Sequence, residues 1–302
     1  MYMWKRLLNR NDAREKARMI VAHHGREYLD HLHIEALAHR LGVELVETRL
    51  DGQRAQLVVG QHGPRILLSD RHEDPDDRRW SIAHELGHYV CGHRPRALAE
   101  LCAPRPEGYR GPHPDEDAAD SFASVLLMPA QHVAAFCDRT PMDFDVPMAL
   151  AETCNVSWEA AAMRIMETTW QVCALAFSQY GRLQWIAPSL PFLMLCGNRL
   201  RPGRMVGPGA LARRFFDTGV CPATSAMVPA SAWVADCDPE ARLQEHSVAT
   251  MDGCMAVTIL WDPNELGYSR PATATLPVVS TTRDYILDQL DDEFAAKRRS
   301  QA

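Results

Sequence analysis

The sequence predicts an α+β protein with two domains, and three observations support this fold class. Short strand-like runs over residues 43–69 precede a segment with helical spacing of apolar residues, 75–92. After Thr168 the pattern changes to alternating strand-like runs. A length of 302 residues with 46% hydrophobic and 24% charged residues also suits two globular domains. We place a first domain at residues 1–170, a smaller α+β domain at 171–290, and a polar tail at 291–302.

Two helices and a small sheet are expected at the start of the chain. The helices cover residues 11–24 and 31–40, each followed by a glycine that can end it. Strand-like runs follow at residues 43–48, 56–59 and 65–69, the last two joined as a hairpin by Gly60-Gln61-His62-Gly63-Pro64. This sheet should support the next helix. An edge strand could also hold an extended peptide segment by backbone pairing.

The next helix contains a His-Glu-x-x-His pattern. Asp74 can cap its start and Gly92 can end it. In a helix His84 and His88 lie one turn apart on one face, so both imidazoles can reach a single metal ion while Glu85 lies beside them. The pattern is short enough to occur by chance, so a metal site needs a third ligand from elsewhere in the chain.

A second helix, at residues 115–129, is the expected source of that ligand. It has acids in its first turn, and Pro129 ends it. Glu116 and Asp120 lie one turn apart, so Glu116 can bind the metal while Asp120 accepts the second N–H of a ligand histidine. An ordinary acidic helix start is the alternative for this segment alone. Its pairing with the histidine helix favours the ligand interpretation.

The segment between the two helices, residues 91–114, is rich in proline and glycine and is expected to run over the surface near the metal. A metal site that hydrolyses peptide bonds would also need a side chain that donates a hydrogen bond to the oxyanion, often a tyrosine or a histidine. Tyr89, Tyr109 and His113 are the candidates, and their spacing does not select among them.

His93 is not expected to complete a three-histidine metal site of the metzincin type. That pattern has a glycine three residues and a histidine six residues beyond its second histidine, whereas this chain has Cys91 and Arg94 there. We expect His93 at the surface or behind the metal ligands.

Together these motifs resemble the ImmA/IrrE family of metallopeptidases. The resemblance covers roughly residues 20–170 and rests on Ala83-His84-Glu85-Leu86-Gly87-His88 followed by Glu116-x-x-Ala119-Asp120-x-Phe122-Ala123-x-x-Leu126-Leu127-Met128-Pro129. It implies a zincin-like fold with His84, His88 and Glu116 as metal ligands and Glu85 as general base. It also implies a protein substrate, typically a helix-turn-helix repressor, in a stress or mobile-element response.

Zn²⁺ is the expected ion, because two histidines and a carboxylate form a common catalytic zinc set; Mn²⁺ or another divalent ion could use the same ligands. Glu85 would take a proton from water and return it to the leaving amine. The alternative is a binding protein that controls a regulator by contact, with a structural metal site and a small-molecule sensor domain. Glu85 favours the enzyme, because a structural site needs no base.

Residues 147–168 are predicted to form two helices with a tight turn and Ser157 as N-cap, an outline similar to a helix-turn-helix. The second helix offers Glu159 and Glu167 against Arg164, and the chain carries a net charge of −7. A DNA-reading helix is usually basic, so direct DNA binding is disfavoured and a packing role is preferred.

The C-terminal domain is expected to contain a hairpin at residues 173–187, a helix at 208–216, and strands at 225–235 and 245–261. By resemblance to longer family members it is expected to be a GAF-like sensor that could bind a small molecule. An aromatic pocket is one interpretation and buried core residues are the favoured one; the aromatic residues concerned are Trp185, Phe192, Trp233 and Trp261.

The nine cysteines form no CxxC pair, which suits reduced thiols better than a disulfide framework. The basic N-terminus lacks the apolar core of a secretory signal, and the most apolar later run, residues 185–196, is interrupted by prolines. We therefore expect a cytoplasmic protein with no membrane span.

Overall fold

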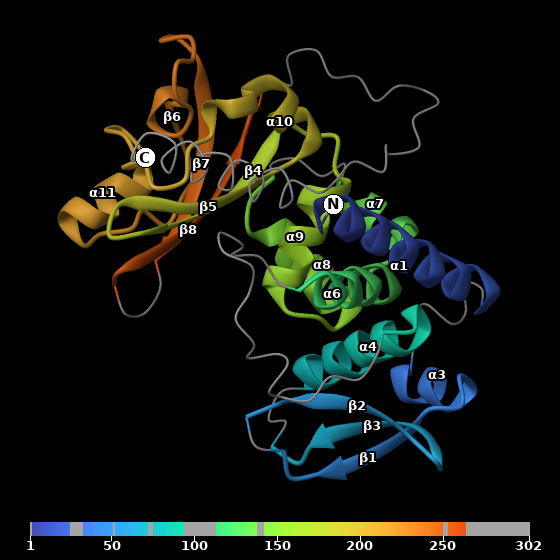
Figure 1. Ribbon diagram of the computed structural model, residues 1–302. Helices are drawn as coiled ribbons and strands as arrows, with labels where there is room; N and C mark the ends of the chain where they lie inside the picture. Colours follow the sequence, from blue (N-terminus) through green and yellow to red (C-terminus); the bar gives the residue numbers. More distant parts are fainter. Residues whose placement is uncertain are drawn as a thin grey trace, which may run out of the picture. The chain divides into compact units, whose positions relative to one another are not determined.

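The computed structural model describes residues 2–24, 33–50, 52–71, 75–93, 113–137, 142–249 and 253–263 (Figure 1). The chain divides into two compact units. The first comprises Met1–His132 with Ala151–Ala160, and the second comprises Val133–Leu150 with Ala161–Ala302. The predicted tail at residues 291–302 lies outside the described residues.

The first unit contains a three-stranded sheet of mixed direction, in the order β1-β3-β2. Its strands are β1 (Glu44–Thr48), β2 (Ala55–Gly60) and β3 (Gly63–Ser69). The predicted hairpin is confirmed, because β2 and β3 pair antiparallel and Gly60 lies opposite Gly63. Strand β1 pairs parallel with the far side of β3, which leaves β2 at an edge of the sheet.

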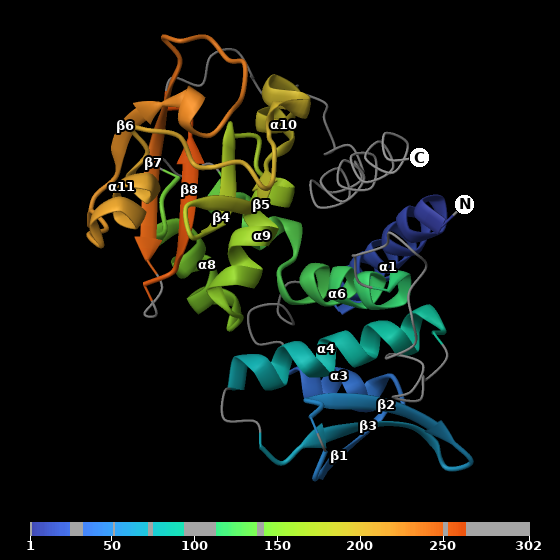
Figure 2. The ribbon, with the colours of Figure 1, turned by 60° about the vertical axis from the view of Figure 1, so that its left-hand side comes forward.

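Four helices cover one side of this sheet in successive layers (Figure 2). They are α1 (Tyr2–His24), α3 (Ile34–Arg40), α4 (Pro75–Cys91) and α6 (Pro114–Leu127). Helix α4 contacts α3, β2 and β3; α6 packs on α4, and α1 packs along α6. Both predicted metal-site helices are confirmed. Helix α1 begins at Tyr2, well before the predicted start at residue 11.

Gly87 lies at a close contact between α4 and α6. A Cβ atom at Gly87 would be 3.0 Å from Cα of Ala119 and 3.1 Å from Cβ of Phe122. Around this point Leu86 of α4 and Ala119 and Phe122 of α6 are fully buried. The missing side chain therefore brings the two backbones together, and with them the residues that each helix presents on this side.

A buried ion pair attaches α1 to α6. Nε of Arg10 lies 3.6 Å from Oδ2 of Asp117 and donates a hydrogen bond of 2.9 Å to Oγ of Ser121. The side chains of Arg10 and Asp117 are 5% and 1% exposed. This pairing of residues that are distant in the sequence could not be read from local patterns.

The second unit is built on a five-stranded antiparallel sheet in the order β5-β4-β8-β7-β6. Its strands are β4 (Cys173–Gln179), β5 (Arg182–Pro188), β6 (Ala226–Pro229), β7 (Arg242–Ala249) and β8 (Met255–Trp261). Tyr180 and Gly181 join β4 to β5 with φ of 48° and 75°, which is the backbone of a tight hairpin turn. The predicted strand at 225–235 is shorter than expected, since the 3-10 helix η2 (Ala230–Ala232) follows β6.

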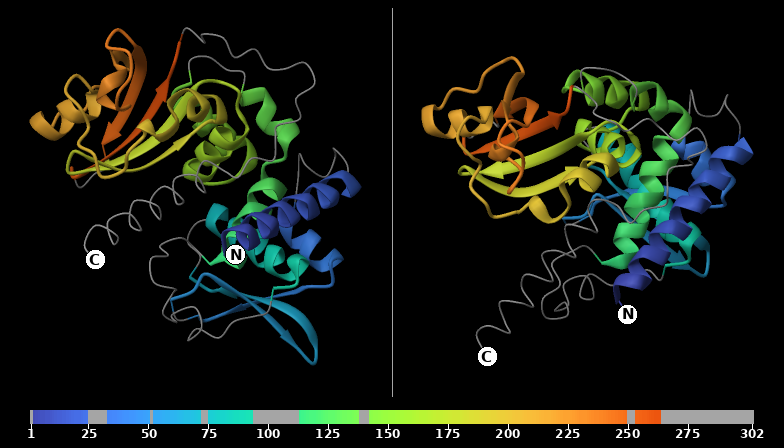
Figure 3. Two further views of the ribbon diagram at one scale, coloured as in Figure 1. Left: turned by 45° about the horizontal axis from the view of Figure 1, so that its top comes forward. Right: turned by 90° about the horizontal axis from the view of Figure 1, so that it is seen from above.

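One face of this sheet packs against α10 (Leu190–Cys196) and α11 (Leu211–Thr218) (Figure 3). The 3-10 helix η1 (Gly197–Arg199) follows α10 directly. Phe192 and Trp233 belong to the buried cluster there, and Trp261 is 5% exposed, as the core interpretation predicts. For Trp185 that interpretation is wrong. Trp185 is 39% exposed and its ring stacks on that of Phe177. Phe177 and Ala176 are neighbours in β4 and so face opposite sides of the sheet, and Ala176 belongs to the core.

The remaining helices are α7 (Ala130–Cys137), α8 (Asp145–Cys154) and α9 (Trp158–Thr168). The predicted two-helix outline at 147–168 is confirmed: Asn155 forms the turn with φ of 50°, and Oγ of Ser157 accepts a hydrogen bond from the Ala160 amide. No helix in the described ranges is long and apolar enough to cross a membrane. The cysteines in those ranges are free thiols.

Candidate metal centre

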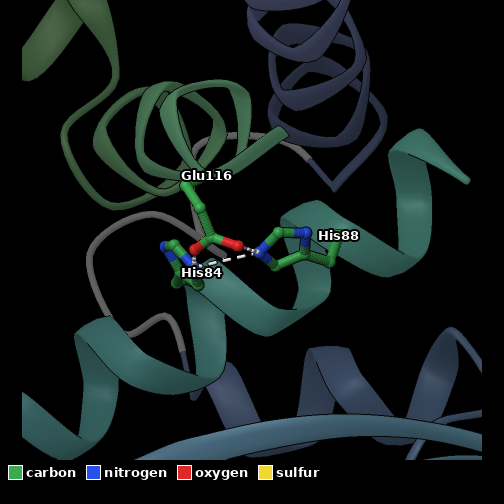
Figure 4. A group of neighbouring side chains, drawn as sticks. All are labelled: His84, His88 and Glu116. Atoms are coloured by element: carbon green, nitrogen blue, oxygen red, sulfur yellow. Dashed lines mark hydrogen bonds and ion pairs between the residues drawn. The ribbon is translucent and has the colours of Figure 1, made fainter. Parts of the chain in front are cut away.

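Two histidines of α4 and one glutamate of α6 point toward a common centre (Figure 4). Nε2 of His84 lies 3.1 Å from Nε2 of His88. The two carboxylate oxygens of Glu116 lie 3.3 Å from Nε2 of His84 and 3.5 Å from Nε2 of His88. The structure thus brings together the three ligands that the sequence predicts, from helices separated by a long proline-rich segment.

The spacing of these donor atoms fits a tetrahedral divalent cation. Donors about 2.0–2.1 Å from a tetrahedral zinc lie roughly 3.3–3.4 Å from one another. The two Nε2 atoms are 3.1 Å apart, and each lies near a different carboxylate oxygen of Glu116, at 3.3 Å for His84 and 3.5 Å for His88, which is close to that value. Among the described residues, His84, His88 and Glu116 form a group whose donor atoms all lie within 4.8 Å. The donors are two imidazoles and one carboxylate, a set common in catalytic zinc sites.

Each ligand histidine also makes a contact through its outer nitrogen. Nδ1 of His84 donates to Oδ1 of Asp120 at 2.9 Å, which leaves the lone pair of Nε2 free to face the centre. This is the arrangement predicted for Asp120. Nδ1 of His88 lies 3.0 Å from Nδ1 of His93, so the second of the two positions expected for His93, behind the metal ligands, is the one observed.

Glu85 follows His84 in α4, close enough for its charge to raise the pKa of His84, and is held by the sheet. Its Oε2 accepts a hydrogen bond of 2.7 Å from the backbone amide of Leu57 in β2. In the β2–β3 register, Gly60 and Gly63 close the hairpin as a hydrogen-bonded pair, so Leu57 falls at a position whose N–H and C=O face away from β3. The edge strand therefore reaches the predicted general base through a backbone group that the sheet does not use.

The charges around the centre are arranged to attract a cation. Burial lowers the pKa of His84, but its hydrogen bonds to Asp120 and Glu116 outweigh this effect and raise the pKa to about 10. Hydrogen bonds from His84 and His88 hold the pKa of Glu116 far below its usual range. Both shifts come from the same close pairing of imidazoles with carboxylates, which raises the pKa of His84 and lowers that of Glu116.

The candidate oxyanion donors lie in different settings. His113 is the N-cap of α6, where its Nδ1 accepts a hydrogen bond of 3.2 Å from the Asp115 amide. Tyr89 follows His88 in α4, so its side chain leaves the helix about 100° around the axis from His88. Tyr109 lies outside the described residues.

Cys91, the last residue of α4, is outside the ligand group, and burial raises the pKa of its thiol to about 11.

The comparisons with known proteins agree with this geometry. Residues 38–166 match the family model described as Peptidase_M78, the IrrE N-terminal-like domain. The solved structures include one described as a Mycobacterium tuberculosis transcriptional regulator, with 14% sequence identity and a TM-score of 0.50. The match covers 86% of this chain and 80% of that chain. At this identity the likeness shows the fold alone. No curated protein matches the chain.

The family match contains both helices of the metal centre, with His84, Glu85 and His88 on α4 and Glu116 on α6. It ends within α9, so most of the second unit lies beyond it. Residues 38–166 are therefore similar to the IrrE N-terminal-like domain of the Peptidase_M78 family, which supports the resemblance found in the sequence.

Proposed function

We propose that this protein is a metal-dependent endopeptidase that makes a regulatory cut in a protein partner, a helix-turn-helix transcriptional repressor. The observation that carries the proposal is the position of Glu85. It follows His84 in α4, takes no part in the candidate ligand group, and is oriented by the Leu57 amide. A carboxylate in this position is what general-base catalysis at a metal site requires.

His84, His88 and Glu116 would hold the ion, with Zn²⁺ as the expected metal and Mn²⁺ as the second choice. A divalent cation in such a site lowers the pKa of a coordinated water to about 7 and polarises the scissile carbonyl. Glu85 then holds the proton that water loses and delivers it to the leaving amine. Asp120 keeps His84 in the tautomer that presents Nε2 to the centre.

The edge strand β2 supports a peptide substrate. The carbonyl of Leu57 and the backbone groups of Val59, two residues later, face the open edge of the sheet, while the Leu57 amide is bonded to Glu85. Val59 is also 55% exposed. An extended segment of a partner could add to this edge by backbone pairing, which would bring its carbonyls close to Glu85.

A sensor role for the second unit completes the proposal. In this proposal the second unit, with its five-stranded sheet, binds a small molecule and thereby controls the activity of the peptidase domain. Direct DNA binding is not proposed, because α9 carries Glu159 and Glu167. A binding protein with a structural metal is the competing function, and it gives Glu85 no chemical task.

The experiment is to incubate the purified chain, loaded with Zn²⁺ or Mn²⁺, with the helix-turn-helix regulators encoded beside its gene, and to identify fragments by mass spectrometry. Glu85→Gln should keep the metal and lose cleavage, whereas His84→Ala should lose both. Glu152→Gln, at an exposed position of α8, is the matched control. Cleavage by Glu85→Gln at the wild-type rate would exclude the mechanism. Absence of fragments from every regulator tested would exclude this substrate class.

A further inference from the structure

The end of α4 places a residue behind one of the metal ligands. The amide of Gly92 donates to the Tyr89 carbonyl at 3.1 Å, and the amide of His93 donates to the His88 carbonyl at 2.9 Å. Gly92 has φ of +70°, a backbone conformation that glycine adopts without strain. These two hydrogen bonds and the left-handed glycine define a Schellman motif, which turns the chain back over the last turn of the helix.

In this motif the residue after the glycine commonly contacts the side chain three positions before the C-cap, usually through apolar groups. Here those two residues are His93 and His88. Their Nδ1 atoms lie 3.0 Å apart, and their rings meet edge to face with centroids 5.1 Å apart. At the C-terminal end of α4 this contact is therefore a hydrogen bond between two imidazoles instead of an apolar contact.

The direction of this hydrogen bond follows from the metal centre. Nε2 of His88 faces His84 and Glu116, so it must offer its lone pair when a cation binds. A neutral imidazole then carries its proton on Nδ1. Nδ1 of His93 must therefore be the acceptor, with the His93 proton on Nε2.

The two ligand histidines are thus supported in parallel. Asp120 of α6 accepts from Nδ1 of His84, and His93 accepts from Nδ1 of His88. One acceptor comes from the partner helix and the other from the cap of the same helix. Without an acceptor at position 93, the ring of His88 could rotate or adopt the tautomer that turns an N–H toward the cation.

We propose that His93 is a positioning residue that fixes the tautomer and orientation of His88 for metal binding. The inference rests on the proposed function, since it assumes that a divalent cation binds the centre. It assigns no ligand role to His93, whose Nδ1 contacts the outer nitrogen of His88.

The test measures Zn²⁺ affinity of the full chain by competition with a chromophoric chelator. His93→Ala and His93→Phe remove the acceptor and should weaken binding by roughly 10- to 100-fold, the range for outer contacts of metal ligands. His93→Asn keeps an acceptor near the position of Nδ1 and should stay within a few-fold of wild type. His62→Ala, at an exposed turn histidine, is the control. Thermal melts by circular dichroism check that each variant is folded.

A second readout is the nitrogen-15 spectrum of the imidazoles in the zinc-loaded protein. A proton on Nδ1 of His88 and none on Nδ1 of His93 supports the proposal. The reverse assignment overturns it, as does a His93→Ala variant that binds Zn²⁺ as tightly as wild type. A wild-type chain that binds no divalent ion overturns the proposed function, and this inference with it.

Discussion

The backbone amide of Leu57 donates a hydrogen bond of 2.7 Å to Oε2 of Glu85. One group belongs to the edge strand of the sheet and the other to the metal helix, and 28 residues separate them in the chain. The amide is fixed by the sheet, so it orients the carboxylate without a side-chain rotamer that could change. The sheet therefore positions the base as well as supporting the helix.

Replacing the Leu57 amide with an ester, by incorporating the α-hydroxy analogue of leucine, removes the donor and keeps the buried side chain. A hydrogen bond to a charged group is worth about 1.5–3 kcal/mol, so kcat for cleavage should fall roughly 10- to 100-fold. Metal affinity should not change. The same ester at Val59, on the same edge, should leave kcat at the wild-type value and change only KM, because the backbone of Val59 is proposed to bind substrate and not to orient the base. An unchanged kcat for the Leu57 ester would show that this contact does not orient the base.

Gly87→Ala should weaken metal binding although alanine favours helices by about 1 kcal/mol over glycine. The new Cβ would meet Cα of Ala119 at 3.0 Å, so α6 must move away and carry Glu116 with it. Isothermal titration with Zn²⁺ would measure the effect. Gly60→Ala, where a Cβ meets nothing within 4 Å, is the control. Equal affinities would mean that the two helices adjust without moving the ligand.

Asp120→Ala should lower metal affinity by roughly 10- to 100-fold, because His84 loses the acceptor that fixes its tautomer. Chelator titration of the metal-loaded chain measures this loss. Asp12→Ala, at an exposed position of α1, serves as the comparison. Metal retention equal to wild type would rule out the role of Asp120.

Asp117→Ala should reduce the free energy of unfolding by about 3–5 kcal/mol, the usual cost of removing one partner from a buried ion pair. Arg10 and Asp117 are both buried, whereas the Asp12–Lys16 pair on α1 is exposed. Asp12→Ala should therefore cost no more than about 1 kcal/mol. Urea denaturation followed by circular dichroism compares the two variants. Similar losses for both would show that the α1–α6 ion pair contributes little.

Glu245 predicts a pH dependence in the second unit. Burial raises the pKa of this carboxyl group, although Trp233, Ala212 and Ser247 donate hydrogen bonds to it. The folded protein therefore binds the Glu245 proton more tightly than the unfolded chain, in which the pKa of this carboxyl group is near its ordinary value of 4.5. The stabilisation by this proton is fully present below that value and is lost as pH rises through the folded pKa.

The measurement is the free energy of unfolding of wild type and Glu245→Gln at a series of pH values from 4 upward. The difference between the two, wild type minus variant, should fall as pH rises. A difference that does not change with pH, or one that grows, would contradict the prediction.

The sequence predicts the metal helices well because their signals are local. Pro75 starts α4 and Gly92 ends it, and the acids at the start of α6 and Pro129 beyond its end mark that helix. Helical periodicity then places the two histidines on one face.

What the sequence could not predict depends on tertiary packing. The Leu57–Glu85 contact requires the order β1-β3-β2, in which β2 becomes the edge, and no pattern within the strands specifies that order. The Arg10–Asp117 pair likewise depends on the docking of α1. His93 is an intermediate case. Gly92 ends the helix that carries His84 and His88, and His93 follows it directly; from this local signal the Schellman contact could have been inferred.

The centre draws its ligands from α4 and α6, two helices whose contact at Gly87 is also the interior of the first unit. A cation shared between them acts as a cross-link within that interior. Loading with metal should thus make this unit more resistant to denaturation, and an ion-depleted cell would weaken its architecture together with its chemistry.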